Sequence, residues 1–186
     1  MISADDLHDV LNESRRLGFL GPAPVEEVVD HAGAYVRALT DVTGTIVDLG
    51  AGGGVPGLVV AAARPDLRLV MIDRRAKRTD FLDRMVRRLG ETDRVQVVAG
   101  DVRRHLETDA ARYDAAIARG FADPETTLTW GARLIRPGGR VIISEPPEGD
   151  RWDDDVLRAA GVERRESERS VAVFESVPGA LDAPRA

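Results

Sequence analysis

Two apolar stripes at helical spacing open the chain. They run through residues 4–17 and 25–39, and the apolar side chains recur at three or four positions, as on one face of a helix. The first stripe contains Leu7, Val10, Leu11 and Leu17, and the second contains Val25, Val28, Val29, Ala32, Tyr35, Val36 and Leu39. Ser3 or Asp5 is available to cap the first helix. The pattern predicts a helical N-terminal segment within residues 1–42.

From residue 45 onward, short apolar runs alternate with amphipathic segments. The expected strands are 45–49, 68–72, 95–98, 113–118, 140–144, 162–168 and 170–176, and the expected helices between them are 56–64, 76–89, 124–134 and 152–160. Such alternation implies a parallel sheet with right-handed crossovers. The prediction is an α/β fold, a Rossmann-like doubly wound, mostly parallel sheet of seven strands that ends in a hairpin, with a short N-terminal helical extension.

This pattern indicates one domain over residues 1–178, with the Rossmann-like core at 45–176. The tail, residues 178–186, contains Pro178, Gly179 and Pro184 and is expected to fray.

A glycine-rich turn joins the first expected strand to its helix. Its sequence is Asp48-Leu49-Gly50-Ala51-Gly52-Gly53-Gly54-Val55. Glycine adopts positive φ and lets a ligand approach the backbone where a Cβ would block it. A strand, a glycine turn and a helix N-terminus together are typical of a nucleotide-like cofactor site, although such turns also connect elements for purely structural reasons.

Two acids accompany this turn. Asp48 precedes Gly50 by two residues, and Asp73 ends the second strand, where a carboxylate can accept hydrogen bonds from both ribose hydroxyls. The pattern Asp-x-Gly-x-Gly-x-Gly resembles motif I of class I S-adenosylmethionine-dependent methyltransferases, whereas dinucleotide dehydrogenases favour Gly-x-Gly-x-x-Gly. This resemblance implies S-adenosylmethionine as the cofactor.

In a doubly wound sheet, ligands bind beyond the carboxyl ends of the strands. That rule gathers residues 50–55, Asp73, residues 101–103 and residues 119–121 around one pocket. Asp101 could bond an adenine amino group or simply end its strand. Phe121 could stack on a flipped base or belong to the core.

Four short segments indicate which family of class I methyltransferases the chain resembles. They are Gly54-Val55-Pro56-Gly57, Asp73 followed by Lys77-Arg78 and Phe81-Leu82, Arg119-Gly120-Phe121-Ala122, and Leu134-Ile135-Arg136-Pro137-Gly138-Gly139. Over residues 45–144 the chain resembles the glucose-inhibited division protein B family, the methyltransferases that modify guanine N7 in small-subunit ribosomal RNA. The resemblance implies cofactor contacts at Gly50, Val55, the pair Val102-Arg103, and Arg119. Together with motif I and the strand-end acids, the expected cofactor site consists of Asp48, Gly50, Gly52, Gly54, Val55, Asp73, Asp101, Val102, Arg103 and Arg119.

The chain departs from this family in three places. Arg103 stands where the family usually has an acid, no Asn-Leu-Thr segment precedes the first strand, and residues 144–147 replace a Lys-Gly pair. All three are expected near the docked substrate.

The resemblance also implies a mechanism. Guanine N7 carries a free lone pair, so methyl transfer needs alignment rather than a general base. Arg119 and Phe121 are the candidate catalytic residues that would hold the base. The chain lacks an Asn/Asp-Pro-Pro-aromatic motif after strand 113–118, which argues against methylation of an exocyclic amino group. The alternatives are a small-molecule methyltransferase on the same fold and a non-catalytic cofactor-binding module.

Charge and composition qualify the choice of partner. The net charge is −6 and aromatic residues are 4% of the chain, which fits a small-molecule substrate somewhat better than RNA. Residues 64–104 nevertheless carry 12 basic and 7 acidic side chains, a local excess that could contact phosphates of a ribosomal RNA or small-subunit partner. Alternatively, Arg84, Arg87 and Arg88 form only the solvated face of a helix.

Other site classes lack a basis in the sequence. The absence of cysteine removes disulfides, thiolate metal sites and a cysteine nucleophile. The three histidines are scattered without ligand spacing, so no metal is expected, and His31 is expected to be a packing or surface residue. No apolar run has membrane-spanning length and the N-terminus is acidic. A cytoplasmic location without a membrane partner is therefore expected.

Overall fold

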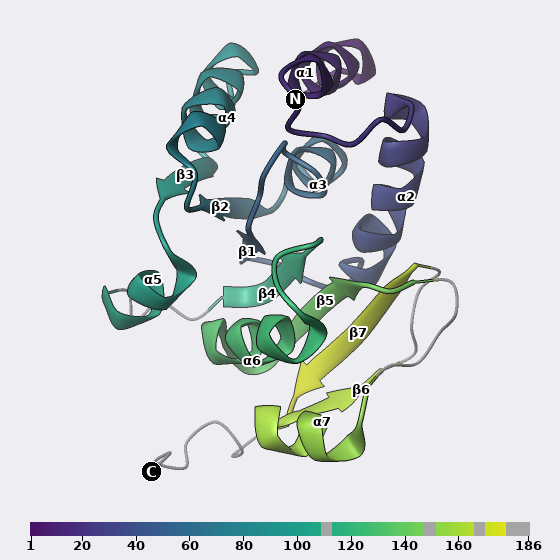
Figure 1. The fold of residues 1–186 in the computed structure, drawn as a ribbon, viewed down its shortest axis with the longest axis vertical. Coiled ribbons are helices and arrows are strands. Elements are labelled where there is room, and N and C mark those ends of the chain that lie inside the picture. Colours follow the sequence, from purple (N-terminus) through teal and green to yellow (C-terminus); the bar gives the residue numbers. More distant parts are fainter. Residues whose placement is uncertain (109–112, 147–151, 166–169, 178–186) are drawn as a thin grey trace.

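The computed structural model describes residues 1–108, 113–146, 152–165 and 170–177 (Figure 1). The expected fraying of residues 178–186 and the end of the expected strand 162–168 lie outside the described residues. No helix in the described ranges is long and apolar enough to cross a membrane.

Seven strands form one sheet in the order β3-β2-β1-β4-β5-β7-β6. Their bounds are β1 Thr45–Leu49, β2 Arg68–Asp73, β3 Val95–Ala99, β4 Tyr113–Ala118, β5 Ile135–Ser144, β6 Val162–Arg164 and β7 Val171–Ser176. Strands β1 to β5 run parallel, while β7 is antiparallel to both β5 and β6. The predicted doubly wound sheet and its terminal hairpin are confirmed. The strand order reverses beside β1, so the carboxyl ends of β1 and β4 flank the expected ligand position.

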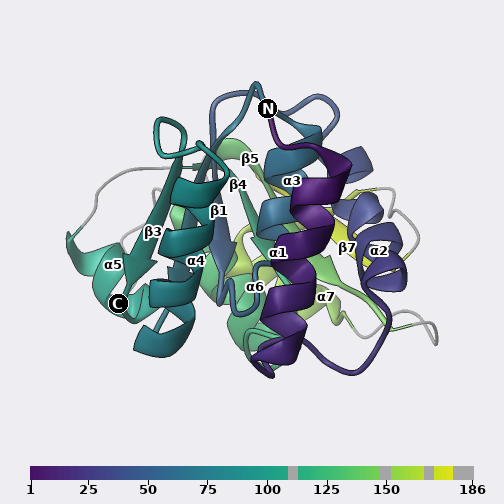
Figure 2. The same cartoon turned by 90° about the horizontal axis from the view of Figure 1, so that it is seen from above.

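Helices cover both faces of the sheet (Figures 1 and 2). One face carries α1 (Ala4–Arg16), α2 (Val25–Ala38), α3 (Gly57–Ala63) and α4 (Ala76–Arg88), and the other carries α5 (Val102–Thr108), α6 (Pro124–Leu134) and α7 (Asp154–Ala160). Successive side chains of β1 point to opposite faces of the sheet and so pack against both helical layers. Ile46 packs in the core cluster on one face, and Val47 and Leu49 pack in the cluster on the other. Burial on both faces explains why the parallel strands are nearly continuous apolar runs.

The N-terminal helices pack against the carboxyl ends of β1 and β4. The hydroxyl of Ser14 in α1 donates a hydrogen bond to the carbonyl of Gly53, at 2.8 Å. The hydroxyl of Tyr35 in α2 donates to the carbonyl of Ala118, also at 2.8 Å. These buried bonds fix both helices beside the glycine turn.

Three predictions about elements were wrong. Helix α5 was not predicted, because seven residues with Val102 and Leu106 one turn apart are too few to show a helical period. Strand β5 begins at Ile135 rather than residue 140, because Ile135 already pairs with Tyr113 before a register shift. Leu17, expected in the apolar stripe of α1, is 49% exposed because the helix ends at Arg16 and the chain turns away.

Candidate functional site

The glycine turn follows β1 directly. Gly50, Gly52 and Gly54 have φ of 68°, 54° and 95°, a region that side chains rarely adopt. A Cβ on Gly53 would lie 2.7 Å from the Ser14 hydroxyl and 2.8 Å from the carbonyl of Phe19. The turn is therefore closely packed from outside by the N-terminal segment.

Asp48 lies beneath this turn and is fully buried. Its Oδ2 accepts a hydrogen bond from the Gly57 N–H at 3.1 Å, and its Oδ1 has no hydrogen-bond partner in the described structure. Burial raises the pKa of Asp48 to about 7, with a smaller contribution from the charge of Asp73, although the Gly57 N–H and the charge of Arg119 oppose the shift. A carboxyl group with this pKa is poised between its neutral and charged forms near neutral pH.

Asp73 connects the glycine turn to the start of α4. Its Oδ2 accepts from the Gly52 N–H at 2.9 Å, and its Oδ1 accepts from the Arg75 N–H at 2.8 Å. The guanidinium of Arg78 lies 3.7 Å from Oδ2. Because the side chain is only 4% exposed, these contacts fix the carboxylate in one orientation at the end of β2.

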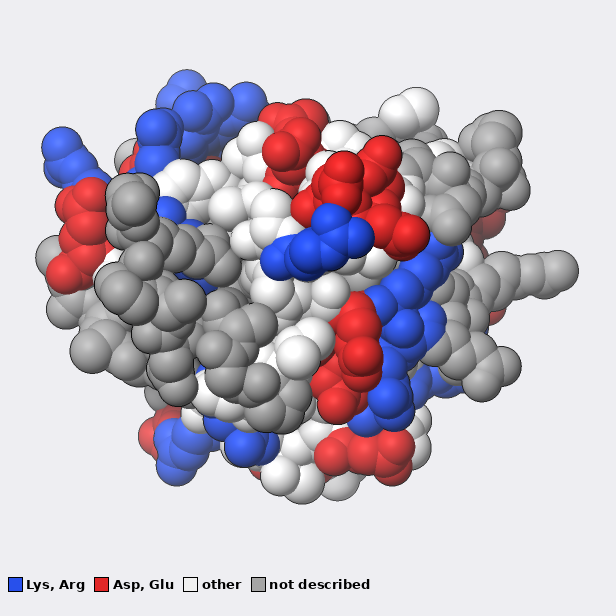
Figure 3. Space-filling view, turned by 90° about the horizontal axis from the view of Figure 1, so that it is seen from below, with Lys and Arg blue, Asp and Glu red and all other residues white. Residues whose placement is uncertain are grey.

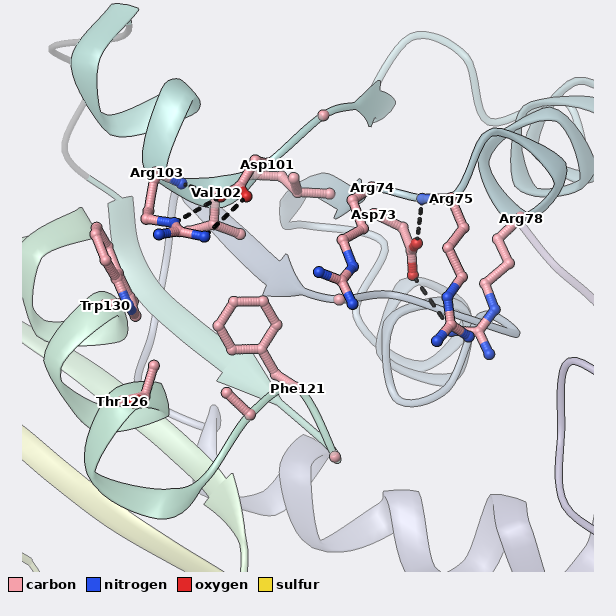
Figure 4. Close-up of a pocket in the computed structure, with 15 residues that line it drawn as sticks. Asp73, Arg74, Arg75, Arg78, Asp101, Val102, Arg103, Phe121, Thr126 and Trp130 are labelled. Carbon is pink, nitrogen blue, oxygen red and sulfur yellow. Dashed lines mark hydrogen bonds and ion pairs between the residues drawn. The ribbon is translucent and has the colours of Figure 1, made fainter.

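A cavity of about 590 Å³ opens at the carboxyl ends of the parallel strands (Figure 4). Asp73, Arg74, Arg75 and Arg78 lie on one side of the view, Arg103, Thr126 and Trp130 on the other, and Phe121 between them. The remaining lining residues are Gly50, Ile72, Gly100, Asp101, Val102, Gly120 and Ala122. The cavity therefore combines apolar and aromatic walls with two carboxylates and four guanidinium groups.

Asp101 and Arg103 form a local pair on this cavity. Asp101 Oδ1 accepts from the Arg103 N–H at 2.9 Å, and the two side chains approach to 3.4 Å. The Arg103 backbone N–H, with the Arg103 and Arg74 charges, holds the pKa of Asp101 below its usual range. Asp101 is therefore ionised at neutral pH and is suited to accept hydrogen bonds, not to donate a proton.

The structure brings together only part of the expected site. Gly50, Asp73, Asp101, Val102, Arg103 and Phe121 line the cavity. Asp48, Gly52, Gly54, Val55 and Arg119 do not line it; the first four are buried in and under the glycine turn. Arg119 follows β4 and is half-buried, and its charge acts on Asp48 and Tyr35 on the α2 side of the sheet.

The sequence reasoning did not select Thr126 and Trp130 for the site. Both belong to α6, which starts just beyond the carboxyl end of β4, and they are one helical turn apart. The prediction of a helix over residues 124–134, after the strand that ends beside the cavity, could therefore have indicated these two residues. Within the described residues, no group of three or more His, Cys, Asp or Glu side chains could hold a metal ion.

Comparison with known proteins identifies the family. The model of the family described as "GidB: rRNA small subunit methyltransferase G" matches residues 25–149. The chain belongs to the GidB family. The matched range contains every residue that lines the cavity.

Curated GidB-family relatives cover much of the chain. The ribosomal RNA small subunit methyltransferase G of Mycolicibacterium gilvum is 30% identical over 174 residues, which are 88% of this chain and 74% of that protein. The protein of the same name from Mycobacterium leprae is 35% identical over 129 residues, 67% of this chain and 52% of the relative. The chain thus spans between half and three quarters of the length of these two relatives.

Solved structures show the same fold as this GidB-family chain. Cofactor-bound Rv0187 from MTB has a TM-score of 0.63 at 19% identity and covers 94% of this chain and 90% of its own. An O-methyltransferase family protein from Burkholderia thailandensis has a TM-score of 0.61 at 17% identity. The match covers 83% of this chain and 56% of that protein. At these identities the comparison establishes the Rossmann-like methyltransferase fold.

Proposed function

We propose that this chain is an S-adenosylmethionine-dependent methyltransferase that modifies a guanine N7 in small-subunit ribosomal RNA. The observation that carries the proposal is the GidB match over residues 25–149, which includes the whole cavity lining. The relatives are named for methylation of small-subunit ribosomal RNA. A ribosomal substrate implies that the protein works in the cytoplasm.

The residues present fit S-adenosylmethionine. Each oxygen of Asp73 accepts one backbone N–H, so a lone pair on each remains for the two ribose hydroxyls. Val102 provides an apolar wall for the adenine, and ionised Asp101 can accept from its amino group. The unpartnered Oδ1 of Asp48 is a buried acceptor under the turn, available for a water that would link it to the cofactor.

Gly50 illustrates why the turn needs glycine. A Cβ at this position would lie 2.8 Å from the Phe121 ring, so a side chain would displace one wall of the cavity. The turn therefore keeps the ring of Phe121 and the backbone of β1 close together, at the place where the cofactor and the base would meet.

When bound, the cofactor supplies an electrophilic methyl group on a sulfonium. The contribution of the chain is to hold the base and the cofactor in line and to exclude water, which can provide most of the rate of such a displacement. Phe121 would stack on the base. Arg119, which follows β4 but does not line the cavity, would act on the base through its charge from beside Phe121. Guanine N7 carries a lone pair and no proton, so the step requires no general base. The two carboxylates that line the cavity, Asp73 and Asp101, act only as hydrogen-bond acceptors.

The test uses the purified protein, S-adenosylmethionine with a labelled methyl group, and small ribosomal subunits from a strain that lacks this gene. Label mapped to a guanine N7 is the expected outcome. Tight cofactor binding without label in the RNA would contradict the ribosomal substrate and favour a small molecule. Loss of label in Arg119→Ala with unchanged cofactor affinity would support the role of Arg119 in holding the base, and full activity of that variant would exclude it.

A further inference from the structure

Three arginines at the junction of β2 and α4 line the cavity: Arg74, Arg75 and Arg78, here called the arginine rim. Arg74 and Arg75 are exposed, and neither side chain forms a hydrogen bond or ion pair with another described residue. The charge of Arg74 acts on Asp101 across the cavity, and only Arg78 is paired, with Asp73. In Figure 4 Arg75 and Arg78 extend to the same side from the start of α4.

The arginines at the two ends of α4 have different surroundings. At its carboxyl end, Arg87 pairs with Asp83, and Arg88 lies 3.5 Å from Asp9 and 3.6 Å from Glu13. Cations are also favoured there by the helix dipole. These arginines have a sufficient structural explanation.

At the amino end of α4 the same dipole disfavours cations. Arg75 is the N-cap residue without a side-chain capping bond, and the first turn contains no acid. The arginine rim therefore lies where positive charge lowers the stability of the helix. The negative charges that the described structure gives it are those of Asp73, 3.7 Å from Arg78, and of Asp101, on which the charge of Arg74 acts. Helix stability does not account for the presence of the rim.

An anion at the mouth of the cavity would supply the negative charge that these arginines lack. S-adenosylmethionine carries a sulfonium and an ammonium group against one carboxylate, so its net charge is positive and it does not account for three arginines. Guanidinium groups bind phosphate through two parallel hydrogen bonds. Elsewhere charge is mixed: acidic and basic side chains are interspersed on the face seen in Figure 3, and the whole chain has a net charge of −6.

We propose that the arginine rim binds backbone phosphates of the RNA next to the nucleotide that enters the cavity. This inference rests on the proposed function for the identity of the polymer. In this proposal Arg74 and Arg75 bind the RNA strand, whereas the carboxylates and the glycine turn bind the cofactor. Such contacts position the RNA without reading its sequence.

The experiment compares R74Q/R75Q with R84Q/R87Q. Both variants remove two positive charges, and the second pair lies on the exposed side of the same helix outside the cavity lining. Binding of a fluorescent transcript of small-subunit ribosomal RNA is measured over a series of salt concentrations, and cofactor binding is measured by calorimetry.

For R74Q/R75Q we expect RNA affinity to fall about tenfold at low salt. The slope of log affinity against log salt should become shallower by about 1.4 to 1.8, because two phosphate contacts are lost. Cofactor affinity should not change, and R84Q/R87Q should bind RNA within about twofold of the unmodified protein. Equal RNA affinity and slope in both variants would overturn the proposal, as would a loss confined to cofactor affinity.

These readouts separate the rim from the proposed function. RNA binding is measured without methyl transfer, so an unmodified protein that binds RNA through the rim but labels no small subunit would refute only the function. A protein that labels guanine N7 while R74Q/R75Q retains its RNA affinity would refute only the rim. An unmodified protein that binds no RNA even at low salt would refute the rim as well.

Discussion

The inner and outer walls of the cavity are built by opposite means. On the inner side, Asp73 lines the cavity and Asp48 lies beneath it. Both are buried and accept hydrogen bonds from backbone N–H groups of the glycine turn, of the start of α3 and of the β2–α4 junction. On the outer side, Arg74 and Arg75 are exposed and have no ion-pair partner in the described structure. The inner wall is thus preorganised by the fold, whereas the arginine side chains of the outer wall are open to a binding partner. Substitutions inside should lower both stability and cofactor affinity. Those of Arg74 and Arg75 should leave cofactor affinity unchanged and should not lower stability, because cations are unfavourable at a helix N-terminus.

The largest effect is expected from Asp73→Asn. The amide loses the negative charge and one acceptor at a position that holds both the turn and a ribose. Cofactor affinity should fall about a hundredfold, the loss typical of a buried charged hydrogen bond. Calorimetric titration with S-adenosylmethionine measures it, with exposed Asp93→Asn as the control. Equal affinity in both variants would place the ribose elsewhere.

Asp48→Asn should remove a pH dependence of stability. An unfolded aspartate titrates near pH 4, whereas burial raises the pKa of Asp48 to about 7. Between these values the native state binds a proton that the unfolded state has lost, so stability falls as pH rises.

From pH 5 to 7, the free energy of unfolding of the unmodified protein should fall by about 2 kcal/mol relative to the variant. Urea titrations at each pH provide the measurement. Parallel pH profiles would mean that Asp48 is ionised throughout.

Gly53→Ala tests the contact between the turn and the N-terminal segment. The added Cβ would lie within 2.8 Å of the Phe19 carbonyl, which cannot move as a side chain can. We expect a loss of about 1–2 kcal/mol in the free energy of unfolding. Gly21→Ala, where no atom lies within 4 Å, should change it by less than about 0.5 kcal/mol. Similar free energies of unfolding for the two variants would show that the N-terminal segment moves aside at little cost.

The smallest effect is expected from Arg88→Gln on the outer surface. Arg88 contacts Asp9 and Glu13 across α4 and α1, and its side chain is 48% exposed. Exposed ion pairs contribute little, so the free energy of unfolding should fall by about 0.5 kcal/mol or less. A thermal unfolding series in low and high salt checks this value. A loss above 2 kcal/mol would show that these pairs hold the N-terminal helix in place.

Much of this architecture was predictable because its signals are local. The alternation of apolar runs determined the sheet, and the glycine turn with Asp73 located the cavity beyond β1 and β2. The short α5 and the early start of β5 were not predictable. A seven-residue helix shows too little periodicity, and the pairing of Ile135 with Tyr113 depends on a neighbouring strand.

By itself, the sequence determined the fold, the family and the chemical character of the cavity, since periodicity, turn residues and strand-end acids act over a few positions. Only the tertiary structure decided which residues line the cavity and which lie beneath it. Asp48 is turned into the core, Trp130 is brought to the mouth by α6, and Ser14 reaches Gly53 across 39 positions. These relations depend on how helices pack across a twisted sheet, and no local pattern encodes that packing.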